Sequence, residues 1–190
     1  MAEEGAISHR FEGESDLTER AGQAGAHFSL IEENVAVGPD PATIHDEWMH
    51  STGHRTNLLN SEVNRVGVAI VASRGMLYAV ADYEHAVPVV AQTQVESAIA
   101  GLLSTRGVTL LSDATVARAA CMMNQGSPVS NAASRPRFIM RWQDSDLTLL
   151  PQALVDRLAT GKYRQASVGS CPAQEMKGGF TAYRVAVLLY

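Results

Sequence analysis

The stretch WMHSTGHRTNLLN, residues 48–60, places His50 and His54 four residues apart beside a tryptophan. On one continuous helix this spacing would put both imidazoles on the same face, as in zinc sites of the HExxH type. Gly53 and the Ser and Thr before it disfavour a continuous helix, so we expect the two histidines on either side of a break. The stretch also lacks the glutamate of that motif, and an HExxH-type site is therefore excluded.

A helix is predicted just before this stretch, in GPDPATIHDEWMHS. Asp40 is a suitable N-cap, and Pro41 suits the first helical position. Ile44 and Trp48, four residues apart, give this helix a buried stripe, so Trp48 is expected in the core.

The rest of the chain predicts a mixture of helices and strands. Residues 1–10 are interpreted as the end of a helix, and 124–136 as a loop. Further helices are expected at 15–23, 94–105, 113–124 and 151–160, and strands at 66–71, 77–83, 138–142, 164–170 and 180–190.

Composition and charge limit the function classes. Of 190 residues, 46% are apolar and 18% charged, which is enough for a real core. No apolar run approaches the roughly 18 residues of a membrane span, and the first residues show no signal peptide. Residues 1–90 hold fourteen acidic residues and five Arg, a net charge of −9, whereas residues 91–190 carry +4. The net charge of +4 on the second half is too small to favour a nucleic-acid partner, and the acidic first half suits attraction of cations.

Histidines and cysteines are separated along the chain. All six histidines lie in the first half, whereas Cys121 and Cys171 lie in the second. A disulfide between the two cysteines would stabilise the fold by roughly 4 kcal/mol on the chain-entropy model. Buried free thiols are the alternative, and the sequence leaves both open.

Several motifs together resemble the bacterial branch of the CAP superfamily, the cysteine-rich secretory, antigen 5 and pathogenesis-related proteins, or SCP-domain proteins. The motifs are HSTGHRTNLLN, NRVGVAIV and LYAVADYE. Upstream, IEENVAVG resembles the family's Gly-Glu-Asn-Ile-Ala segment, with Glu33 at the glutamate and Glu32 in place of the glycine. ISHR resembles the family's Phe-Ser-His and puts His9 at its first histidine. The matching positions in the central motif are Trp48, Ser51, Gly53, His54, Arg55, Asn57, Leu59, Asn60 and Val66-Gly67-Val68.

The resemblance implies an α+β fold, a three-layer α-β-α sandwich with a mostly antiparallel central sheet. It also implies that His9, Glu33 and His54 line one cleft that could hold Zn²⁺ or another divalent cation. A second acidic group of the family has no counterpart at Ser51, so either Asp46 or Glu47 supplies it or it is missing. Family members have been associated with metal, with sterol or lipid, and, disputedly, with proteolysis.

The second half looks like a degenerate copy of the first. STRGVTLLSDATVARAACMMN resembles the family's opening helix, which the first half lacks, and Asn131 falls about where His9 does. YAVA at 78–81 is echoed by YRVA at 183–186. We therefore expect a CAP-like domain at 1–87, a connector at 88–93 and a CAP-like half without the site at 94–190. That half either folds independently or completes the first fold.

Two functions are compatible with these residues. The first is a secreted or cell-envelope binding module whose His/Glu cleft holds a divalent cation, a small ligand or an extracellular partner. The second is a metal-dependent, peptidase-like hydrolase with His9, His54 and Glu33 around an activated water. The sequence lacks a nucleophile motif, which favours binding. The alternative interpretation of His54 and Glu33 is structural. In it, the His54 ring holds the loop through hydrogen bonds, and Glu33 accepts hydrogen bonds from backbone amides.

Other polar residues near the motif are expected to be structural. His45 and His50 are interpreted as surface residues of the 41–50 helix. Arg55 and Asn57 are expected to fix the loop rather than contact a ligand. Ser51 has no histidine-activated setting, so a serine hydrolase is excluded.

Overall fold

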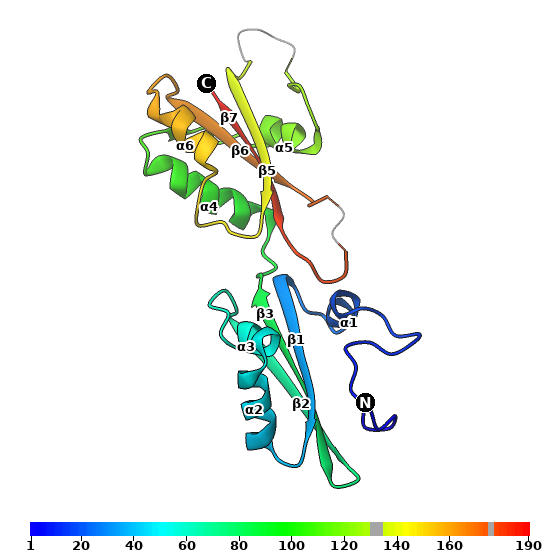
Figure 1. Cartoon of the computed structure of the whole chain (residues 1–190). Coiled ribbons are helices and arrows are strands. Elements are labelled where there is room, and N and C mark those ends of the chain that lie inside the picture. The colour runs from blue at the N-terminus through cyan, green and yellow to red at the C-terminus, as the bar shows by residue number, and fades with distance from the viewer. Residues whose placement is uncertain (130–134, 175–176) are drawn as a thin grey trace. The chain divides into compact units, whose positions relative to one another are not determined.

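A computed structural model describes residues 1–129, 135–174 and 177–190 (Figure 1). The chain divides into two compact units. The first is Met1–Pro88 with a short return segment that ends at Thr181, and the second is the remainder, including Ala182–Tyr190. Asn131 and part of the predicted loop 124–136 lie outside the described residues. Both units combine helices with largely antiparallel sheets, which confirms the predicted α+β class.

The first unit contains a three-stranded antiparallel sheet in the order β1-β3-β2. Helices α2 and α3 pack on one face of this sheet, and α1 contacts β1. The bounds are α1 Leu17–Gln23, β1 Phe28–Gly38, α2 Pro41–His50, α3 Thr52–Leu58, β2 Arg65–Ser73 and β3 Met76–Ala86.

Helix α2 begins as its sequence predicts. The Asp40 side chain accepts a bond of 2.9 Å from the Thr43 N–H, and Pro41 follows at the first helical position. Ile44 and Trp48 are buried against alanines of β1 and β3. The Trp48 indole N–H also donates to the Val35 carbonyl at 3.3 Å, so Trp48 is a core residue, as predicted.

The helix break lies earlier than the position of Gly53 suggests. Ser51 is extended, with ψ of 122°, and separates α2 from α3, so His50 and His54 fall on different helices, as predicted. Gly53 itself is inside the first turn of α3.

A two-residue turn joins β2 and β3 and fixes their register. Arg74 and Gly75 have φ of 54° and 79°, as a type I′ turn requires. The closing pair is Ser73 opposite Met76, and the pairing runs without a bulge to Arg65 opposite Glu84. These strands contain the two predicted at 66–71 and 77–83.

Strand β1 was not predicted from the sequence, and neither were α3 and the short strand Thr109–Leu110. Strand β1 spans eleven residues and pairs with β3. Three consecutive polar residues, Glu32, Glu33 and Asn34, interrupt its apolar pattern. Residues 1–10, interpreted as a helix end, contain a single turn in which the Gly5 N–H bonds to the Met1 carbonyl.

The return segment of the first unit packs against α1 and β1. The Gly179 N–H donates to the Thr18 carbonyl at 3.2 Å, and Phe180 meets Phe28 edge to face at 4.9 Å between ring centres. A Cβ on Gly22 would lie 2.6 Å from the Gly179 nitrogen, so this close approach requires glycine.

The second unit is a three-layer sandwich around a four-stranded sheet in the order β4-β6-β7-β5. Along β7, Val185, Val187 and Leu189 face one side with α4 and α6, whereas Ala186 and Leu188 face α5. The bounds are α4 Gln92–Ser104, β4 Thr109–Leu110, α5 Thr115–Met122, β5 Phe138–Asp144, α6 Gln152–Ala159, β6 Gln165–Cys171 and β7 Tyr183–Leu189.

Helix α5 lies unusually close to β6. A Cβ on Gly169 would lie 2.2 Å from the Arg118 backbone nitrogen, so only glycine permits this contact. Cys121 and Cys171 form a disulfide across the same interface, with their Cα atoms 5.8 Å apart. The disulfide is therefore the alternative that the structure selects.

Candidate ligand site in the first unit

The structure brings two of the three predicted site residues into contact. His9 Nδ1 lies 2.8 Å from Glu33 Oε1. The Glu33 side chain, in the middle of β1, is only 6% exposed, whereas the His9 ring is 59% exposed. His9 therefore covers a buried carboxylate from the solvent side.

His54 is tied to the sheet through its backbone. Its carbonyl accepts a bond of 3.0 Å from the Asn34 side-chain amide. No contact among the described residues joins its imidazole to His9 or Glu33. A common site for all three residues therefore stays a prediction.

Arg20, on α1, completes the surroundings of Glu33. Its Nη2 lies 3.0 Å from Glu33 Oε2, and its Nη1 donates to the carbonyls of His9 and Ser15. Arg20 thus fixes the segment before α1 onto β1. Both oxygens of the Glu33 carboxylate have partners.

Asp82 is the acidic neighbour of Glu33. It lies directly opposite Glu33 in the β1–β3 pairing. Its Oδ1 atom is buried and has no hydrogen-bond partner among the described residues. Burial is the main factor that raises the pKa of Asp82 to about 6, the nearby charge of Glu33 adds to it, and Arg20 opposes it. A side-chain hydrogen bond with Glu33 also raises the pKa of Asp82, so Asp82 ionises only near neutral pH, with the Glu33 carboxylate beside it.

Asp46 and Glu47 are the candidates for a second acidic group that the sequence suggests, and Asp82 is not among them. Asp46 and Glu47 are exposed on α2, and the Asp46 carboxylate lies 3.4 Å from His50. His45 and His50 are exposed there too, as predicted. The available signal was Asp82 itself, a lone acid within the apolar run LYAVADY, where a half-buried strand would place a carboxylate toward a partner.

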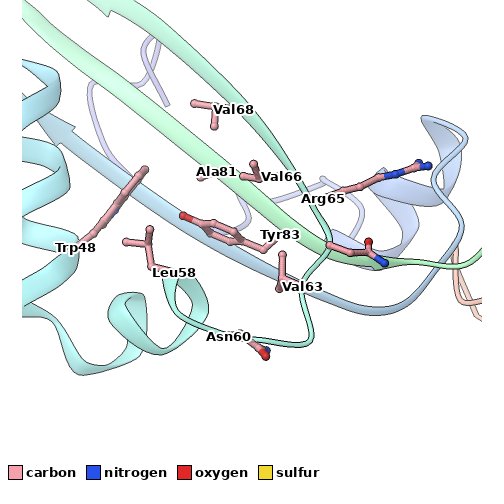
Figure 2. A pocket seen from close by; sticks show the side chains of 10 residues that line it. Trp48, Leu58, Asn60, Val63, Arg65, Val66, Val68, Ala81 and Tyr83 are labelled. Atoms are coloured by element: carbon pink, nitrogen blue, oxygen red, sulfur yellow. The ribbon is translucent and has the colours of Figure 1, made fainter.

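Two pockets lie on opposite faces of the sheet near β2. The first, of ≈ 290 Å³, is lined by alanines of α1 and its C-terminal loop, by Ile31, Val66 and Gly67, by the acidic residues Asp82 and Glu84, and by one cation, Arg65. The second, of ≈ 530 Å³, is lined largely by apolar side chains, among them Trp48 and Tyr83 (Figure 2). We call them the acidic pocket and the apolar groove.

The asparagines of the motif hold the loop and helix against β1. The Asn57 amide donates to the Asn34 side-chain oxygen at 2.9 Å and to the Glu33 carbonyl at 3.3 Å. The Asn60 amide donates to both oxygens of Glu32 at 3.1 Å. Asn57 therefore fixes local structure, as predicted.

The donors near Glu33 do not form a recognisable metal centre. In the described parts of the chain, no group of three or more His, Cys, Asp or Glu side chains is arranged to hold a metal ion. Glu33 is already bonded to His9 and Arg20, and the guanidinium adds positive charge at the point where a cation would bind.

Comparison with known proteins addresses the first unit. Residues 1–83 match the model of CAP, the cysteine-rich secretory protein family. This match confirms the likeness of residues 1–83 to the CAP superfamily, whereas the bacterial branch stays a prediction, and we call residues 1–83 the CAP region. Comparisons with curated proteins and with solved structures give no match. The likeness of the second unit to the same family stays a prediction.

Membrane insertion through a helix has no support. None of the helices in the described ranges has the length and apolar character needed to cross a bilayer.

Proposed function

We propose that the CAP region is a binding module that takes up a cationic group in the acidic pocket. The observation that carries this proposal is the buried, unpartnered Oδ1 of Asp82 next to a second carboxylate. A buried acceptor without a donor costs roughly 1–3 kcal/mol, and more when it is charged. A ligand that donates to Asp82 would recover part of this cost and offset the repulsion from Glu33.

Two kinds of cation fit the proposal to different degrees. A divalent ion such as Zn²⁺ would use His9, Glu33 and Asp82, with His54 as the further ligand that the motifs predict. An organic ammonium needs only hydrogen bonds to Asp82 and a negative surrounding. Arg20 disfavours the divalent ion more than the ammonium, because its guanidinium repels a doubly charged ion more strongly. We therefore favour an organic cation.

A metal-dependent hydrolase remains the second candidate from the motifs. Catalytic zinc sites use three protein ligands and keep a fourth position for water. His9 and Glu33 bond to each other, and in the described residues no three such donors are arranged to hold a metal ion together. Binding is therefore better supported than catalysis, and screening for peptidase and esterase activity with and without a chelator tests the alternative directly.

A secreted or cell-envelope location is part of the proposal. The disulfide between Cys121 and Cys171 supports an oxidising compartment, and the match to a secretory family points the same way.

Calorimetric titration of the full chain tests the proposed function. n-Butylammonium and Zn²⁺ serve as probes, and butanol is the neutral control. We expect butylammonium to bind at pH 7.5, more weakly at pH 5 where Asp82 is protonated, and not to bind Asp82→Asn. The exposed Asp46→Asn is the matched control and should bind like the wild type.

His54 requires its own comparison. If zinc binds through the predicted ligands, His54→Ala and Glu33→Gln should each reduce the heat of zinc binding. Equal heats for the wild type and both variants would refute the metal site, and equal butylammonium binding by wild type and Asp82→Asn would refute the acidic pocket.

A further inference from the structure

Strand β2 has an exposed, apolar and unprotected free edge. It is the end strand of its sheet and, within the described residues, pairs with β3 alone. Val66, Val68 and Ile70 are 58%, 62% and 49% exposed. Edge strands are usually blunted by lysine, proline or a bulge, and β2 has none of these.

The turn determines which backbone groups point outward. In a two-residue hairpin the closing pair, here Ser73 and Met76, exchanges hydrogen bonds, and bonded and non-bonded pairs then alternate. Gly67 opposite Asp82 is therefore a bonded pair, and its N–H and C=O face β3. Val66, Val68 and Ile70 direct their N–H and C=O groups to the free edge. A row of backbone donors and acceptors is thus open to a further strand.

The two faces beside this edge differ in chemistry. Val66 and Val68 belong to the apolar groove, in which Tyr83 and Trp48 lie nearby (Figure 2). The opposite face carries the acidic pocket with Asp82. On β2 the residue opposite Asp82 is Gly67, where an added Cβ would find no atom within 4 Å. The missing side chain leaves a passage from the edge to the carboxylate.

We propose that β2 binds an extended peptide as an additional strand, with apolar side chains over the groove and a lysine or arginine passing over Gly67 to Asp82. Peptides recognised in this way gain affinity from main-chain hydrogen bonds and specificity from alternate side chains. The inference rests on the proposed function, because it names the cation in the acidic pocket as the side chain of a peptide.

The spacing of a sheet permits this contact. Neighbouring strands lie about 4.8 Å apart, so the added strand would lie about 10 Å from β3. The flexible four-carbon stem of lysine and the Asp82 side chain, extending toward each other across Gly67, span that separation. A side chain at position 67 would occupy the same path.

Charge complementarity favours a basic peptide over a neutral one. Residues 1–90 contain fourteen acidic residues, five arginines and no lysine. Glu84 joins Asp82 in the acidic pocket, and its nearest cation, Arg65 Nη1, is 3.9 Å away and 73% exposed. An acidic edge attracts basic segments and repels acidic ones.

Fluorescence anisotropy with a labelled peptide, acetyl-Val-Lys-Val-Lys-Val-Lys-Val-amide, and the full chain tests the proposal. Gly67→Val should weaken binding at least tenfold by closing the passage, and Gly67→Ala should weaken it less. Ala69→Val places the same valine side chain on the same face of β2, opposite Val80 rather than Asp82, and should change the Kd less than twofold. Thermal unfolding confirms that each variant is folded.

Peptide controls separate strand addition from simple charge attraction. A peptide N-methylated on alternate residues, which cannot donate to the edge, and the block isomer Val₄Lys₃ should both bind at least tenfold more weakly. Equal binding of either one, or equal effects of Gly67→Val and Ala69→Val, would overturn the proposal. A dimer through β2, seen by sedimentation and lost in Val68→Lys, would also overturn it.

The two proposals fail in different ways. If butylammonium binds through Asp82 while no peptide binds, the acidic pocket stands and strand addition is wrong. If the peptide binds equally well to wild type and to Asp82→Asn, the cation in the acidic pocket is refuted, and this inference with it.

Discussion

Replacing Asp82 by asparagine should stabilise the first unit at neutral pH and leave it unchanged in acid. The pKa of Asp82 is raised from 3.8 to about 6 in the folded chain. Between these two values the native state binds a proton that the unfolded state has released, so stability falls as the pH rises. Above pH 6 the full cost of the ionised carboxylate is present. Below pH 4 both states are protonated and the cost is absent.

The size of the effect follows from the pKa difference. A shift of about two units corresponds to ~3 kcal/mol at 1.36 kcal/mol per unit. Asp82 is only partly buried, so solvent screening reduces this figure, and we take about half, ~1.5 kcal/mol. Asparagine keeps the shape of the side chain, removes the charge and offers Glu33 a donor. We expect Asp82→Asn to raise the free energy of unfolding by ~1.5 kcal/mol at pH 7.5.

Urea unfolding at pH 3 and pH 7.5 measures this difference. Each unit contains one tryptophan, Trp48 in α2 and Trp142 in β5, so a Trp142→Phe background lets Trp48 fluorescence report on the first unit. Asp46→Asn, at a carboxylate that is 73% exposed, is the control and should shift stability by less than about 0.5 kcal/mol at either pH. A gain that is equal at both pH values, or a loss at pH 7.5, would refute the electrostatic explanation.

Three further outcomes follow from the packing. Replacing Cys121 and Cys171 together by alanine should cost the second unit roughly 4 kcal/mol on the chain-entropy model, measured by urea unfolding with Trp142 fluorescence; a cost below 1 kcal/mol would contradict that model. Gly169→Ala should lower the thermal midpoint strongly, because its Cβ would meet backbone at 2.2 Å, whereas Gly101→Ala in α4, with open space around it, should raise stability by about 1 kcal/mol. Trp48→Ala should cost about 3–5 kcal/mol in urea unfolding of the first unit, and a loss under 1 kcal/mol would show that its burial contributes little.

Local signals predicted the elements whose start and stop chemistry lies within a few residues. Asp40 and Pro41 located α2, and the alternation of apolar residues around the turn at 73–75 located the β2–β3 hairpin. Strand β1 was not located, because the partners of its polar residues come from distant segments. Glu33 is satisfied by His9 and Arg20, and no local pattern records that these residues meet the strand.

The same distinction between local signals and distant partners applies to the residues of the candidate site. The motifs directed attention to His9 and Glu33, which the structure places in contact. Asp82 was overlooked because its importance depends on the register of β1 against β3, which pairs it with Glu33. A shift of that register by one residue would turn one carboxylate to the opposite face and remove the repulsion that raises the pKa.

The motif at 51–60 makes hydrogen bonds that hold β1 in place. Asn57 binds the carbonyl of Glu33 and the side chain of Asn34, and the His54 carbonyl accepts a bond from the same Asn34. These bonds tie β1, the strand that carries Glu33, to α3, and β1 also pairs with β3. Asn57→Ala should therefore weaken cation binding at Asp82 indirectly, by loosening the strand that places Glu33 opposite it. A motif of this kind is needed for the site even though its side chains do not line the acidic pocket.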